Sequence, residues 1–153
     1  MPTPLTQRDV EDVATRLGRI PTVDFEVVTR DADGSPAVIR NAPFDHFGAP
    51  MPTLYWLVDP VLCKAVGRLE STGGVREAER SVDATALAAA HDRYAAERDR
   101  EISGSHVGPR PSGGVGGTAQ GVKCLHAHYA YLLAGGDDPV GRFVAERLEA
   151  ERS

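Results

Sequence analysis

Four side chains with reactive or charged groups lie close together in the segment "GVKCLHAHYAYLLAGG", residues 121–136. Lys123 could neutralise an anion, Cys124 could act as a nucleophile, and His126 could transfer a proton, because an imidazole titrates near neutral pH. On a helix, His126 and His128 would point roughly 160° apart, so this pair would not chelate one ion. Cys124 and His128 would instead share a helix face, and the start of the helix would favour the Cys124 thiolate.

A glycine-rich stretch, residues 103–121, precedes this segment and contains seven glycines. A glycine-rich loop that enters a helix exposes backbone N–H groups, and the helix dipole favours an anion there. Val122 separates the last glycine from Lys123, so the stretch departs from a Walker A loop and we expect no nucleoside triphosphate. A flexible loop without a ligand is the alternative. The predicted ligand-binding residues are Gly114, Gly116, Gly117, Gly121, Lys123 and Arg98.

The alanine-rich segment "DATALAAAHDRYAAERDREI", residues 83–102, is predicted to form a helix whose buried face carries His91 and Arg98. Burying an unpaired guanidinium is costly, so Arg98 must contact a carboxylate, backbone carbonyls or a bound anion. We expect His91 and Arg98 to share a cleft with Lys123 and His126, because consecutive elements are usually neighbours in space. The predicted catalytic residues are His126, His91 and Cys124.

Two metal-dependent alternatives remain open. His91 and Asp92 resemble the "HD" pair of metal phosphohydrolases, but on a helix Asp92 would point about 100° away from His91. A mixed site would require the tertiary fold to bring together Cys63, His91, Cys124 and His128. The sequence does not show such a convergence, and we predict neither a metal nor another cofactor.

The elements around these residues predict an α+β fold in a single domain, residues 1–153, with a small N-terminal antiparallel sheet packed with a C-terminal set of helices. The sheet part spans about 20–58. Its densest run of β-forming residues, "PTLYWLV" at 52–58, is predicted to be an interior strand. The helical part spans about 59–150 and is interrupted by the glycine-rich loop at 103–121.

Composition limits the classes of partner. The 153 residues carry a formal net charge of −5, which gives no bulk attraction to nucleic acid or to anionic lipid. No apolar run approaches the ~20 residues of a membrane helix, so we expect no membrane insertion. Two cysteines are too few for a disulfide framework, and we expect a cytoplasmic protein with reduced thiols.

The stretches "PTLYWLVDP…GRLES" and "GVGGTAQGVKCLHAHYAYLLAGGDDPVGRFV" resemble the actinobacterial proteins grouped as domain of unknown function 501. The likeness covers about residues 23–148, and "KCLH" is one of its most specific parts. The family has no established activity. The resemblance implies a bacterial cytoplasmic protein, with relatives often encoded beside a septum-formation initiator and an exopolyphosphatase-like enzyme. Many relatives have cysteines at positions that match residues 30–36 and Asp59, where this chain has none.

Our first functional hypothesis is a pocket for a small phosphorylated or carboxylated ligand. The glycine-rich loop and Lys123 would form one wall, and His91, Arg98 and His126 the other. His126 would transfer a proton if the ligand reacts. The sequence does not decide whether the chain is an enzyme.

The second hypothesis is a non-enzymatic protein-interaction module linked to cell division or envelope growth. In this case the glycine-rich loop would become ordered on contact with a protein partner. This hypothesis requires an exposed apolar patch near Tyr55 and Trp56.

Overall fold

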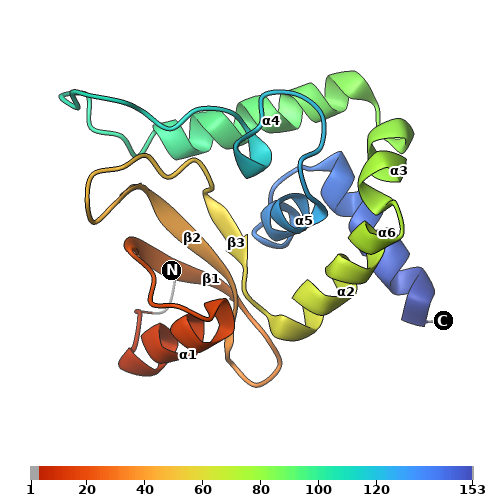
Figure 1. The fold of residues 1–153 in the computed structure, drawn as a ribbon, viewed down its shortest axis with the longest axis horizontal. Helices are drawn as coiled ribbons and strands as arrows, with labels where there is room; N and C mark the ends of the chain where they lie inside the picture. Colours follow the sequence, from red (N-terminus) through yellow and green to blue (C-terminus); the bar gives the residue numbers. More distant parts are fainter. Residues whose placement is uncertain (1–3, 153) are drawn as a thin grey trace.

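The computed structural model describes residues 4–152 and shows an α+β fold, as the sequence predicts. One helix and three strands come first, and the other helices follow (Figure 1). The elements are α1 (Gln7–Leu17), β1 (Val23–Arg30), β2 (Pro36–Asp45), β3 (Tyr55–Leu57), α2 (Pro60–Ser71), α3 (Gly74–Ser81), α4 (Ala84–Asp99), the 3-10 turn η1 (Val115–Gly117), α5 (Leu125–Leu133) and α6 (Pro139–Arg152). Within this part of the chain, no helix is both long enough and apolar enough to cross a membrane.

The three strands form an antiparallel sheet in the order β1-β2-β3. The prediction that residues 52–58 form an interior strand is wrong, because β3 has only three residues and lies at the edge of the sheet, while β2 is central. Leu54, Tyr55, Leu57 and Val58 are buried all the same, and Trp56 is half-buried. Helices cover these side chains at the edge where an interior position in the sheet would require a further strand.

Tyr94 of α4 covers the free edge beside β3. Its hydroxyl accepts hydrogen bonds from the backbone N–H groups of Leu54 (2.6 Å) and Tyr55 (3.0 Å). Tyr94 is fully buried, and burial raises the pKa of its phenol well above the ordinary value, so the hydroxyl stays neutral. This contact blocks pairing with another strand and fixes α4, with the residues it carries, against the sheet.

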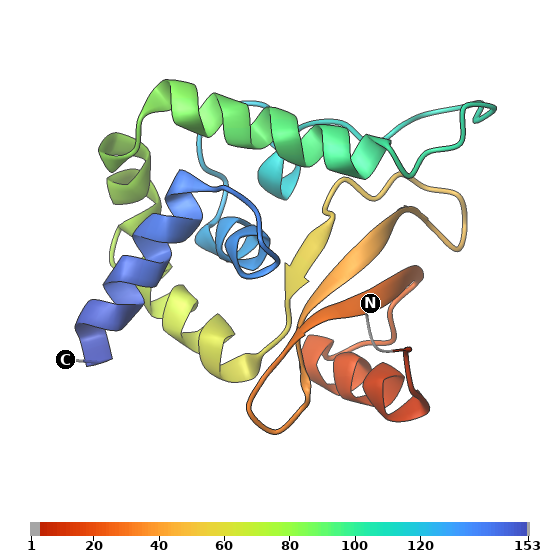
Figure 2. The same ribbon diagram turned by 180° about the vertical axis from the view of Figure 1, so that it is seen from behind.

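The two faces of the sheet are covered by different elements (Figures 1 and 2). On one face, Val13 of α1 packs with Val27 and Ile39. On the other face, Val38 and Leu57 belong to the larger core that the helices build. The alternation of side chains along β2 therefore separates a small core under α1 from the main core.

Helix α5 lies in the middle of the helical part, against β3, α2 and α6 (Figures 1 and 2). Six of its nine residues are buried, so apolar contacts surround it where the sequence predicted a single buried face. The helix begins at Leu125, and Cys124 is its N-cap with an extended backbone (φ −151°, ψ 155°). The prediction that Cys124 and His128 share a helix face is therefore wrong, because Cys124 lies outside the helix.

Candidate functional site

His91 fastens the glycine-rich loop to α4. The N–H of Val115 donates to His91 Nδ1 (3.0 Å), and His91 Nε2 donates to the carbonyl of Gly121 (2.8 Å). Since Nδ1 accepts a hydrogen bond, the ring is the neutral tautomer with its proton on Nε2. Both ring nitrogens are engaged by the loop backbone, so His91 holds the loop and has no nitrogen left for a ligand.

Arg98 is buried, as predicted, and backbone carbonyls are its main partners. Its Nη1 donates to the carbonyls of Pro52 (3.1 Å) and Gly113 (2.9 Å), and its Nη2 to that of Pro111 (3.4 Å). Its Nε donates to the Asp99 carboxylate (3.0 Å). The guanidinium therefore holds the middle of the loop against α4, and the protein itself supplies the partners that an anion would otherwise provide.

Two of the four predicted glycines are packed inside the protein. A Cβ on Gly114 would lie 2.5 Å from the Cβ of His91, so no side chain fits there, and Gly116 is buried at a φ of 71°. The N–H of Gly114 donates to the Thr118 carbonyl (2.6 Å), and that of Gly117 to the Gly114 carbonyl (3.0 Å). These amides stabilise the loop itself, so they do not form the cradle of free N–H groups that the glycine pattern suggested.

Gly117 and Gly121 line a cavity of ≈670 Å³, together with Thr118, Gln120, Val122, Lys123 and Glu79. An adjacent cavity of ≈390 Å³ is lined by Ala84, Leu87, Ala88, His91, Ala119 and three residues of the first cavity, Glu79, Gln120 and Gly121. We call the two spaces together the loop cavity. Its first part is lined mainly by residues 117–123, at the end of the loop and just after it, and its second part mainly by α4 residues.

Lys123 and Glu79 are the charged residues of the loop cavity. Lys123 is exposed, whereas Glu79 Oε2 accepts the N–H of Val122 (2.9 Å) and so ties the end of the loop to α3. One ammonium and one carboxylate leave the lining without net charge, and an anion with several phosphate or carboxylate groups would gain little there. A ligand with one anionic group and an apolar body matches this lining better.

His126 is absent from the lining of the loop cavity and faces α2. Its Nδ1 lies 2.9 Å from Glu70 Oε1, and its Nε2 lies 3.1 Å from the carbonyl oxygen of Cys63. Glu70 Oε2 accepts the N–H of Leu125 (2.7 Å). Both ring nitrogens of His126 therefore face groups of the protein, and neither is directed toward the loop cavity. The Glu70 side chain thus caps the start of α5, a position where the sequence predicts a bound anion.

The cysteines are protonated thiols. Burial raises the pKa of the Cys124 thiol, and the N–H groups at the start of α5 only partly offset this effect. Burial also raises the pKa of Cys63, whose Sγ–H donates to the carbonyl of Leu57 (3.2 Å). The expectation of a stabilised Cys124 thiolate is therefore wrong, because desolvation outweighs the helix start.

The residues considered for a mixed metal site have separate partners. His128 is fully buried, and its Nδ1 lies 2.6 Å from an oxygen of Asp138, whose other oxygen accepts two N–H groups at the start of α6. The rings of His128 and His91 meet edge to face at 5.6 Å. Among residues 4–152, no group of three or more His, Cys, Asp or Glu side chains could hold a metal ion.

Three residues that shape this region were not predicted. Glu79 lies on α3, a helix that the sequence does not signal because Gly73 and Gly74 suggest only the end of α2. Asp138 precedes Pro139 directly, and an acidic residue before a proline is a helix-start signal that could have found it. The role of Tyr94 depends on a contact 40 residues away in sequence, which no local pattern shows.

Fold and site together define a small α+β protein with a glycine-rich loop that a histidine and an arginine fix to one helix. The chain belongs to the family described as "Protein of unknown function (DUF501)", which matches residues 27–146. This range includes the whole glycine-rich loop and both halves of the loop cavity. No curated protein and no solved structure matches the chain.

Proposed function

We propose that this protein binds a small organic anion with a single carboxylate or phosphate group and an apolar body. The observation that carries the proposal is Lys123, an exposed ammonium in the lining of a ≈670 Å³ cavity that adjoins an apolar cavity of ≈390 Å³. Sites for small molecules measure roughly 300–1,000 Å³ and combine apolar walls with a few polar groups. The carboxylate or phosphate would contact Lys123, and the apolar body would contact α4.

The rigidity of the loop supports this proposal. His91 and Glu79 hold the loop at Val115, Gly121 and Val122, so the wall of the cavity is formed before a ligand arrives. A preformed site binds more tightly because less conformational entropy is lost on binding.

The proposal is binding without a proton-transfer step. Both ring nitrogens of His91 and of His126 are engaged by groups of the protein, and the Cys124 thiol has a raised pKa. We infer that the protein acts in the cytoplasm of an actinobacterial cell, as its sequence resemblance implies.

The protein-interaction alternative has less support. The apolar patch that it requires near Tyr55 and Trp56 is not formed, because Tyr55 is 5% exposed and Arg19 lies over the half-buried Trp56 ring at 5.6 Å. We therefore keep the loop cavity as the proposed site.

Isothermal titration calorimetry with isovalerate and isobutyl phosphate tests the proposal. We expect Lys123→Met to weaken binding at least about tenfold, because a charge-assisted contact contributes roughly 1.5–3 kcal/mol. Ala88→Phe should also weaken binding by filling the apolar part of the cavity. Lys64→Met is the matched control, since Lys64 is the other lysine of the chain and lies exposed on α2. Equal affinities of the Lys123 and Lys64 variants, or no binding of either probe, would overturn the proposal.

A further inference from the structure

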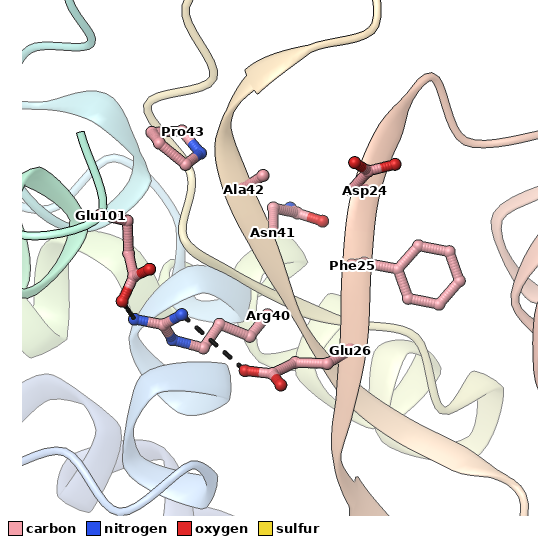
Figure 3. Close-up of a pocket in the computed structure, with 8 residues that line it drawn as sticks. All are labelled: Asp24, Phe25, Glu26, Arg40, Asn41, Ala42, Pro43 and Glu101. Atoms are coloured by element: carbon pink, nitrogen blue, oxygen red, sulfur yellow. Dashed lines mark hydrogen bonds and ion pairs between the residues drawn. The ribbon is translucent and has the colours of Figure 1, made fainter. Parts of the chain in front are cut away.

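A second cavity lies on the sheet, apart from the glycine-rich loop (Figure 3). It measures ≈370 Å³, and we call it the sheet cavity. Its lining comes from β1, from β2 and from the segment after α4: Asp24, Phe25, Glu26, Arg40, Asn41, Ala42, Pro43 and Glu101. Figure 3 shows the Phe25 ring pointing away from the other labelled side chains, so the polar residues supply most of the chemistry.

An irregularity in strand pairing opens this cavity. Val23 pairs with Asp45 and Phe25 with Asn41, so two steps along β1 correspond to four along β2. The extra residues of β2 form a bulge that includes Ala42 and Pro43, and both residues line the cavity beside Asn41. Bulges of this kind commonly redirect side chains at the rim of a sheet.

The charges of the sheet cavity favour a cation. Three carboxylates and one guanidinium line it, which leaves two negative charges in excess. The contacts of Arg40 with carboxylates are long, at 3.4 Å to Glu101, 3.8 Å to Glu26 and 3.9 Å to Glu97, and Arg40 also contacts the Tyr55 hydroxyl. The carboxylate oxygens of Glu26 and Glu101 therefore retain capacity to accept further hydrogen bonds.

Asn41 provides an independent indication of a ligand that donates hydrogen bonds. The residue is 1% exposed, and its Nδ2 donates to the carbonyl of Thr53 (3.1 Å). Its Oδ1 has no hydrogen-bond partner among the described residues, and Figure 3 shows this oxygen directed toward β1. A buried amide oxygen without a partner is costly, and an N–H donor in the cavity would relieve that cost.

We propose that the sheet cavity binds a small organic cation with N–H donors, such as a diamine or a guanidino-amine. Such a ligand supplies positive charge that balances the excess of carboxylates. It also supplies the hydrogen-bond donor that Asn41 Oδ1 lacks. A metal ion fits less well, because the ligand residues do not converge in any group of three within residues 4–152. The proposal is independent of the loop cavity, since the two sites share no lining residue.

Titration of the ¹⁵N-labelled protein with agmatine, followed by NMR, tests the proposal. We expect the amide signals of residues 24–26, 40–42 and 101 to shift. Tetramethylammonium, a cation without N–H donors, should leave them unchanged. The double variant Glu26→Gln/Glu101→Gln keeps the shape of the cavity and removes two charges, so agmatine should bind it at least about tenfold more weakly.

The matched control is Glu11→Gln/Glu146→Gln, which removes two exposed carboxylates elsewhere on the chain. Equal weakening in both double variants would show that agmatine responds only to net charge, and this would overturn the proposal. So would equal shifts with tetramethylammonium, or the absence of shifts around the sheet cavity with agmatine.

Discussion

At the residue scale, backbone groups of the protein occupy the polar atoms of His91 and Arg98, which tie the glycine-rich loop to α4. The helical pattern correctly predicts that His91 and Arg98 are buried, because burial follows from their place on one face of α4. It does not predict their partners, since the carbonyls of Pro52, Gly113 and Gly121 reach them only through the tertiary fold. A buried polar residue is therefore predictable from the sequence, whereas its role is not.

The thiols of Cys63 and Cys124 provide a test at this scale. Their raised pKa values keep the thiolate fraction low at neutral pH, so we expect iodoacetamide to label them more slowly than the same cysteines in urea. The labelling rate of the folded protein should continue to rise with pH past the ordinary thiol pKa. Mass spectrometry of a labelling time course measures both. Labelling of Cys124 at pH 7 faster than that of glutathione would contradict the raised pKa.

At the scale of elements, α4 organises the site. It closes the edge of the sheet through Tyr94 and holds the glycine-rich loop through His91 and Arg98. Its start is well predicted, because Asp83 is an N-cap signal, whereas the helix ends at Asp99, three residues before the predicted end at residue 102. The short helix α3 is missed because it begins at Gly74, directly after Gly73, and this glycine pair indicates only the end of α2. The site residue Glu79 is missed with it.

The packing of the loop on α4 predicts that Gly114→Ala lowers stability by about 2 kcal/mol, since the new methyl group would overlap the Cβ of His91. Thermal unfolding followed by circular dichroism measures the effect. Gly104→Ala is the control, because a Cβ at Gly104 meets nothing within 4 Å and its φ is not in the left-handed region. Equal melting temperatures of the two variants would show that the loop does not pack closely on His91.

At the scale of the whole molecule, the order of sheet and helices follows from the sequence, while the position of each cavity depends on long-range contacts. The residue types of 52–58 favour a strand and predict an interior position in the sheet. The strand instead lies at the edge, and helices bury its apolar side chains there. Lys123 was predicted as a ligand-binding residue from its place after the glycines, and it does line the loop cavity. His126, three residues later, faces α2, because the chain turns between them to begin α5.

The most direct test of the proposed function is the map of amide shifts when isovalerate is added to the ¹⁵N-labelled protein. We expect the largest shifts in residues 117–123 and 84–91, the two walls of the loop cavity, and none in residues 24–26 and 40–42 of the sheet cavity. Lys123→Met should need at least about tenfold more isovalerate to give the same shifts, because it loses a charge-assisted contact, and Lys64→Met should leave the titration unchanged. Shifts that are absent, or that centre on any other part of the chain, would contradict the assignment of the loop cavity as the binding site.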